Sequence, residues 1–272
     1  MTEQIFSKNG LYYRLNKFGE NRLTLVFIHG LSGSSSAWLP YEKFFEEKYN
    51  VLSFDLRGHG KSLKYKNYDD HRIEKFAEDI NELITHLAIN KFALVSHSFG
   101  TYIAFEFLRK HQDKVALAVF LSPGLYVGKR KLAVLIKPLL RFYRFFANSL
   151  PFLPRPGRHI DYSKYKDTGD WNIRRMFADI GNTGLRPYLY GTLQLYENDF
   201  EAILKKIKIP TLIIHGEKDT IIPAGGSKII SEKIKNSKLV FLPGANHILV
   251  LNNFSEVSVE ISKFLDENKN TL

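Results

Sequence analysis

The chain alternates between short, continuously apolar segments and longer segments whose apolar residues recur every three or four positions. The apolar runs predict strands at residues 24–28 (TLVFI), 51–55 (VLSFD), 92–96, 115–121 (VALAVFL), 211–214 and 239–242. A further strand, 11–18, is expected to turn near Asn21 into 24–28. Helical spacing is clearest in 73–87, and it also predicts helices at 41–48, 101–110 and 254–265. Apolar strands that are interleaved with helices indicate an α/β fold with a mostly parallel central sheet and helices on both faces.

The strand–helix alternation stops at Pro123–Gly124 and resumes near Ile209–Pro210. The stretch between them is basic, aromatic and helical in character, and five prolines divide it into short pieces. We therefore predict a core formed by residues 1–124 and 205–272, with residues 125–204 inserted as a helical cap over one edge of the sheet.

The overall composition is that of a folded protein, with 272 residues of which 44% are hydrophobic and 25% are charged. There is no cysteine, which excludes disulfide scaffolds, thiolate metal sites and a cysteine nucleophile. No histidine pair has zinc-ligand spacing such as H-E-x-x-H, so neither a metal nor a cofactor is expected. The N-terminal MTEQIFSKNG lacks the basic and apolar regions of a signal peptide, and no apolar run is long enough to span a bilayer. A cytoplasmic protein is expected.

The net charge is strongly positive: 39 basic minus 28 acidic residues gives +11. Between Gly124 and Phe200 there are 13 basic and 6 acidic residues, so +7 of the excess lies in this stretch, which makes up most of the predicted cap. Within it, residues 128–154 (GKRKLAVLIKPLLRFYRFFANSLPFLP) mix basic residues with an aliphatic and aromatic face. That face could cover the sheet edge, line an acyl pocket or touch an anionic membrane. No recognition motif accompanies the charge, so nucleic-acid binding is not expected.

Candidate chemistry begins at residues 96–100 (SHSFG), which follow a predicted strand and open a predicted helix. A sharp strand-to-helix turn of this kind would hold Ser98 in a strained conformation with its hydroxyl beyond the sheet. Small neighbours let the backbones approach: Gly100 meets this requirement, whereas Ser96 stands where glycine is usual. The N-terminus of the helix would favour negative charge that develops on a substrate.

Further polar segments follow the other predicted strands. Residues 28–33 (IHGLSG), 55–62 (DLRGHGKS), 215–219 (HGEKD) and 244–247 (GANH) all lie at strand ends. With these segments the sequence resembles the α/β-hydrolase superfamily over nearly its whole length, and 55–62 is the most specific element of the resemblance.

The resemblance implies Ser98 as nucleophile, His247 as general base and Asp219 as the acid that orients the imidazole, in the chain order that this fold uses. It also implies an oxyanion hole made by the backbone N–H groups of Leu31 and Phe99. Glu217 is a less favoured alternative acid. Supporting roles are expected for four residues beside these groups: His29, Gly30, His97 and Gly100. Asp55, Arg57 and His59 are interpreted as a structural loop.

Serine at position 98 argues against epoxide or haloalkane chemistry, for which relatives of this fold use an aspartate nucleophile. We therefore predict an α/β-fold serine hydrolase, similar to carboxylesterases and lipases, that cleaves small carboxylic esters with an apolar, monoacyl lipid-like acyl group. Thioester, amide or C–C bond hydrolysis remains an alternative, and so does a non-catalytic receptor that binds a ligand under the cap. The basic cap argues against a cationic substrate.

Overall fold

The computed structural model describes residues 1–125 and 130–269, with the backbone alone described for 130–138. One eight-stranded sheet runs through the molecule in the order β1-β2-β4-β3-β5-β6-β7-β8. Its strands are β1 (Thr2–Phe6), β2 (Leu11–Leu15), β3 (Thr24–Ile28), β4 (Asn50–Phe54), β5 (Phe92–His97), β6 (Val115–Leu121), β7 (Thr211–Gly216) and β8 (Ser237–Leu242). From β4 to β8 all neighbours are parallel, which confirms the predicted fold class.

The N-terminal edge of the sheet differs from the expectation. The strand at 11–18 ends at Leu15, and it pairs with an unpredicted strand, β1, and with β4. It does not form a ladder with β3, although the chain does turn at Asn21, which has a φ of 58°. β1 was missed because four of its five residues are exposed, so it carries no apolar signal.

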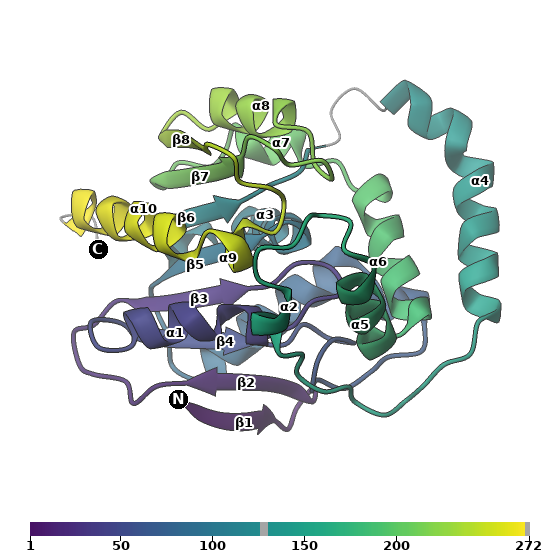
Figure 1. Cartoon of the computed structure of the whole chain (residues 1–272), viewed down its shortest axis with the longest axis horizontal. Coiled ribbons are helices and arrows are strands. Elements are labelled where there is room, and N and C mark those ends of the chain that lie inside the picture. Colours follow the sequence, from purple (N-terminus) through teal and green to yellow (C-terminus); the bar gives the residue numbers. More distant parts are fainter. Residues whose placement is uncertain (126–129, 270–272) are drawn as a thin grey trace.

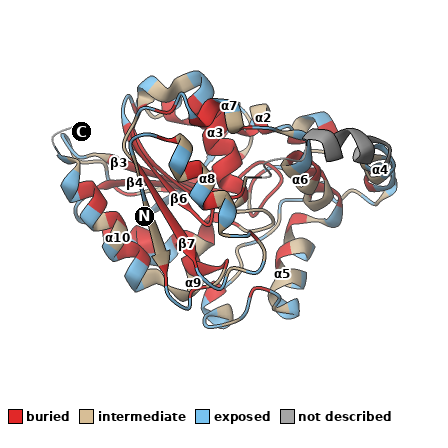
Figure 2. Cartoon of the chain, turned by 90° about the horizontal axis from the view of Figure 1, so that it is seen from above, coloured by how far each residue is buried: buried red, intermediate tan, exposed pale blue. Residues whose placement is uncertain are grey.

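Helices cover both faces of the sheet, as Figures 1 and 2 show. One face carries α2 (Ile73–His86), α3 (Phe99–His111), α7 (Glu201–Leu204) and α8 (Gly225–Lys233). The other carries α1 (Leu39–Phe45), α9 (Leu249–Asn252) and α10 (Phe254–Glu267). Successive residues of β5 enter opposite cores: Phe92 and Leu94 pack on one face, Ala93 and Val95 on the other. The strands are therefore apolar throughout, because both of their faces are buried.

Residues 125–204, hereafter the insertion, lie between β6 and β7 and contain α4 (Arg130–Ser149), α5 (Ile173–Thr183) and α6 (Leu185–Glu197). In Figure 1 these helices stand on the right, at the end of the molecule opposite the two chain termini. A small apolar cluster formed by Tyr68 of the core with Ala147, Tyr190 and Leu193 joins α4 and α6 to the core. The end of the insertion, with Phe200, packs in the main core.

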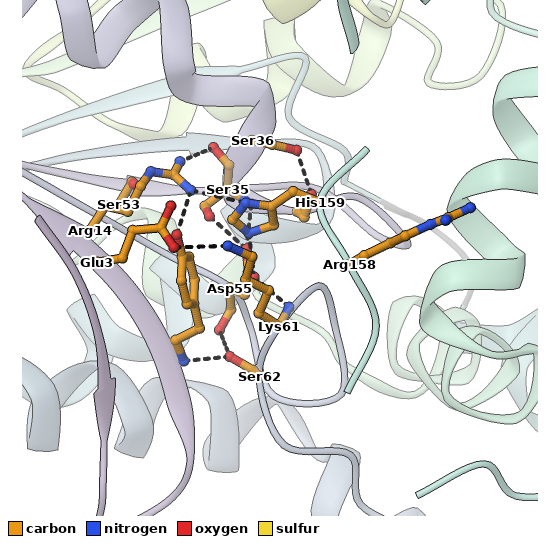
Figure 3. Close-up of polar contacts among 12 residues, drawn as sticks. Glu3, Arg14, Ser35, Ser36, Ser53, Asp55, Lys61, Ser62, Arg158 and His159 are labelled. Atoms are coloured by element: carbon orange, nitrogen blue, oxygen red, sulfur yellow. Dashed lines mark hydrogen bonds and ion pairs between the residues drawn. The ribbon is translucent and has the colours of Figure 1, made fainter. Parts of the chain in front are cut away.

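A buried polar network fastens another part of the insertion (Figure 3). The Asp55 carboxylate accepts hydrogen bonds from Ser35 N and Oγ (2.7 and 2.6 Å) and from Lys61 N (2.7 Å), and its Oδ2 lies 2.9 Å from Nε2 of His159 in the insertion. Ser36 Oγ donates to the carbonyl of Ile160 beside it. Burial alone would raise the pKa of the Asp55 carboxyl, but the hydrogen bond and attraction of His159, helped by Ser35, lower it to about 2.

This network predicts a pH-dependent contribution to stability. The pKa of Asp55 is depressed from its ordinary 3.8 in the folded state, so its stabilisation is present above about pH 4 and is lost as the pH falls toward 2. D55N should lower the free energy of unfolding by about 2 kcal/mol at pH 7, and by clearly less at pH 3. Urea unfolding of both proteins at pH 7, 5 and 3 measures this difference.

The matched control is D113N, because Asp113 is an exposed aspartate in the short turn Gln112–Lys114 and is not one of the residues that bind Asp55. A stability difference between D55N and the wild type that stays constant over the three pH values would contradict the assignment.

Candidate active site

Ser98 occupies the sharp turn between β5 and α3. Its φ of 51° and ψ of −117° lie in a region that residues other than glycine rarely adopt. Gly100 makes the turn possible, because a Cβ there would lie 2.7 Å from the carbonyl oxygen of His29 and 2.8 Å from that of Ile28. The start of α3 is thus pressed against the end of β3, at the carboxyl edge of the sheet.

Ser96, at the position where glycine is usual, is accommodated. Its side chain is fully buried, and its Oγ lies 3.2 Å from Thr101 Oγ1 in the first turn of α3. The hydroxyl that replaces a hydrogen here therefore has a partner.

The structure brings the predicted triad together. His247 Nε2 lies 2.9 Å from Ser98 Oγ, and His247 Nδ1 lies 2.8 Å from Asp219 Oδ2. These contacts fit an imidazole that donates from Nδ1 to the carboxylate and accepts the serine hydroxyl proton at Nε2. The second oxygen of Asp219 accepts hydrogen bonds from the backbone N–H groups of Ile221 (3.0 Å) and Ile222 (2.8 Å).

The Asp219 carboxylate is electrostatically favoured in its ionised form. Burial opposes ionisation, but the hydrogen bond and charge interaction with His247, together with the Ile222 N–H, lower the pKa of Asp219 below its usual range. The rival acid Glu217 is exposed, and His247 contacts Asp219 instead.

The loop after β3 lies against the same turn. Gly30 is needed there, because a Cβ on it would lie 3.0 Å from His97 Nδ1 and 3.4 Å from Ser98 Cβ. Leu31 and Phe99, whose N–H groups are the predicted oxyanion donors, both line the cavity that contains Ser98. The insertion supports this loop through Thr183 Oγ1, which donates to the carbonyl of Ser32 (2.9 Å).

Two neighbouring histidines, His29 and His97, contact backbone groups through their ring nitrogens. His97 Nε2 lies 2.9 Å from the carbonyl oxygen of His247. The His97 ring therefore connects the turn at Ser98 to the base loop, the loop after β8 that contains His247. His29 Nε2 accepts the N–H of Leu56 (3.0 Å), and its Nδ1 faces the carbonyl of Gly30. Burial lowers the pKa of His97 to about 3 and that of His29 to about 4, so both rings are neutral at pH 7.

The loop at 55–62 is held by its own internal and core contacts. Arg57 forms a bidentate pair with Asp79, both contacts being 2.6 Å, while His59 is buried with its pKa lowered to about 3 by desolvation. Among the described residues, the cavity lining includes none of Asp55, Arg57 and His59. This placement agrees with a structural loop.

A cavity of about 360 Å³ opens above Ser98 and His247. The core contributes Ile221, Ile222, Ile248, Val250 and Leu251 to its wall, and the insertion contributes Met176, Ile180, Tyr188, Leu195 and Tyr196. Three charged side chains interrupt this mainly apolar lining: Asp170, Arg175 and Asp179. Tyr162 Oη donates to Asp179 (2.8 Å), whose pKa burial raises to about 6.

The described side chains of α4 do not line this cavity, so for them the acyl-pocket expectation was wrong. Leu140 and Tyr143 pack with α6, whereas Leu139, Phe142, Phe145 and Phe146 are 64, 66, 71 and 48% exposed. The helix carries apolar residues on two sides, and α5 and α6 occupy the position next to Ser98. Leu132, Leu135 and Ile136, which belong to the apolar face of residues 128–154, lie outside the described side chains.

The sequence did not identify three charged residues that line the cavity: Asp170, Arg175 and Asp179. They lie in the insertion, in and after an irregular segment, and no spacing or motif links them to the triad.

The parallel sheet, the strained serine turn and the Ser98–His247–Asp219 contacts define an α/β-hydrolase arrangement. Residues 24–254 match the family described as the alpha/beta hydrolase fold, and the chain belongs to that family. Among the described residues, no helix is both long and apolar enough to cross a membrane.

The chain is similar to characterised proteins over nearly its full length. It is 28% identical to a bifunctional esterase/perhydrolase of Acinetobacter calcoaceticus over 96% of this chain and 98% of that protein. It is 26% identical to epoxide hydrolase 3 of Mus musculus over 89% of this chain and 70% of the relative. The enol-lactonase of Burkholderia xenovorans LB400 superposes with a TM-score of 0.74 at 21% identity, covering 97% of this chain and all (100%) of that one. The protein is a hydrolase of the α/β fold.

Proposed function

We propose that the protein is a serine hydrolase of carboxylic esters with apolar acyl groups. The observation that carries this proposal is the Ser98 hydroxyl, 2.9 Å from His247 Nε2, at the base of a largely apolar cavity. Ser98 Oγ attacks the ester carbonyl carbon while its proton passes to His247 Nε2. Asp219 holds the imidazole in position and stabilises the imidazolium that forms.

The negative charge that develops on the carbonyl oxygen is stabilised by the N–H groups of Leu31 and Phe99. When the tetrahedral intermediate collapses, His247 protonates the departing alcohol and leaves an acyl group on Ser98. Water then attacks this ester and gives its proton to His247. When the second intermediate collapses, His247 returns this proton to Ser98 Oγ and the carboxylic acid is released. In a related mechanism, removal of one oxyanion-hole donor costs about 2.7–4 kcal/mol of transition-state stabilisation.

Other chemistries of the family differ in how well they fit the site. Serine at position 98 cannot form the alkyl ester that an aspartate nucleophile makes, so the activity named for the epoxide hydrolase relative is not proposed here. Thioester, amide or C–C bond hydrolysis would use the same triad, and these activities are separated by substrate tests. A non-catalytic receptor function would require that Ser98, His247 and Asp219 hydrolyse no substrate. A cytoplasmic location, expected from the sequence, stays a prediction.

We also propose that the outer face of the insertion contacts anionic membranes. The exposed α4 residues Leu139, Phe142, Phe145 and Phe146 lie beside the exposed Arg141. On α5, Ile173 and Phe177 are 67 and 74% exposed beside the exposed Arg174. Apolar and aromatic side chains mixed with arginines are typical of helices that lie at a lipid interface, and the +7 excess supports an anionic partner.

The hydrolase proposal predicts that p-nitrophenyl esters from acetate to laurate are cleaved, with a preference for chains longer than acetyl because the cavity is apolar. S98A should lower kcat by about 10⁴-fold or more, since it removes the nucleophile. The matched control is S255A, because Ser255 is an exposed serine on α10. Equal, slow hydrolysis by the wild type and S98A would contradict the proposal.

The membrane proposal predicts that the protein sediments with vesicles containing phosphatidylglycerol and less with pure phosphatidylcholine, with binding that weakens as salt rises. The double variant F142S/F145S should bind anionic vesicles at least about tenfold more weakly, because it removes two inserting rings. V259S serves as control, since Val259 is an exposed apolar residue on α10. Equal binding by F142S/F145S and the wild type would overturn the proposal, as would a protein dimer held together by these phenylalanines.

A further inference from the structure

Asp170 lies between the two loops that supply the acid and the base of the triad. It belongs to the insertion, in the segment between the short turn of 3₁₀ helix at Tyr162–Tyr165 and α5. Its side chain is only 4% exposed. One carboxylate oxygen accepts the backbone N–H of His247 (2.8 Å), and the other accepts the N–H and the Oγ–H of Thr220 (2.9 and 2.8 Å).

Thr220 directly follows Asp219, so Asp170 holds the backbone next to the acid with one oxygen and the backbone of the base with the other. A carboxylate has two acceptor oxygens and no donor, and here it meets three donors from two loops. An asparagine in its place would turn an N–H group toward one set of donors, and an alanine would leave all three without this acceptor.

The segment around Asp170 is itself fixed on the same loops. The carbonyl of Thr168 accepts hydrogen bonds from the side chains of Asn246 (3.0 Å) and Asn252 (2.8 Å). Trp171 Nε1 donates to Thr220 Oγ1 (3.0 Å), and Arg175 Nη2 donates to the carbonyl of Asp170 (2.6 Å). The insertion therefore reaches the loop of His247 and the loop of Asp219 at several points, and the Asp170 carboxylate contacts both. It adds to the direct backbone hydrogen bond from Lys218 N to the carbonyl of Ala245 (2.8 Å).

We propose that Asp170 is a positioning residue for the hydrolytic reaction, acting through the backbones of His247 and Thr220 rather than on the substrate. This inference rests on the proposed function of the triad. Asp170 sets the separation of the two loops and hence the His247–Asp219 and His247–Ser98 contacts. The insertion is then part of the catalytic geometry as well as a wall of the cavity.

The test compares D170N and D170A with the wild type on the best p-nitrophenyl ester. A misplacement of a catalytic group by about 1 Å can lower rates about 100-fold, so kcat should fall by about 10- to 100-fold while KM changes less than about threefold. T220V removes the hydroxyl donor and keeps the N–H, so its loss should be smaller. D161N is the matched control: Asp161 is an exposed carboxylate of the insertion whose contacts stay within its own turn.

A second measurement needs no turnover, so it separates this proposal from the proposed function. The proton between His247 Nδ1 and Asp219 should give a low-field NMR resonance, which D170N and T220V should shift or broaden and D161N should leave unchanged. A wild type without esterase activity would overturn the proposed function and leave this readout valid. Unchanged kcat and resonance in D170N would overturn the positioning role, and a raised KM at constant kcat would reassign Asp170 to substrate binding. If D170A fails to fold, the kcat and the resonance of D170N and T220V alone test the positioning role.

Discussion

The close approach of two backbones at the serine turn is the constraint on which the rest of the site depends. Gly100 and Gly30 leave room for β3, β5 and α3 to approach one another closely. The sharp turn between β5 and α3 forces Ser98 to a positive φ. Such a conformation is unfavourable by about 1–3 kcal/mol and persists only where the surrounding structure determines it. Here the buried strands of the parallel sheet provide that rigid surrounding, and the hydroxyl is presented at its carboxyl edge.

The other proposed catalytic groups are attached to this turn by polar contacts. His97, next to Ser98, forms a hydrogen bond with the carbonyl of His247, and Asp170 accepts the N–H of His247. The base loop is thereby fixed from the core on one side and from the insertion on the other. Because the nearby buried histidines are neutral, they add hydrogen bonds without adding positive charge beside His247.

The parts of the molecule that could be predicted from the sequence are those with a recognisable pattern of neighbouring residues. Continuous apolar runs such as 115–121 locate the buried strands, and the polar segments at strand ends locate the groups that meet at one edge. β1 has no such signal, since its residues are mostly exposed and its pairing depends on β2. Contacts such as His159 with Asp55, or Asp170 with His247, join residues 104 and 77 positions apart. They depend on how the insertion folds back on the core, and no periodicity in that proline-rich stretch encodes it.

In the proposed reaction, Ser98 carries the acyl group during turnover. Rapid acid quenching during hydrolysis of a p-nitrophenyl ester, followed by mass spectrometry of the intact protein and its peptides, measures this directly. We expect one acyl group per chain, on the peptide that contains Ser98, and no such adduct in S98A. Steady hydrolysis with no acyl adduct, or an adduct on another residue, would contradict the claim.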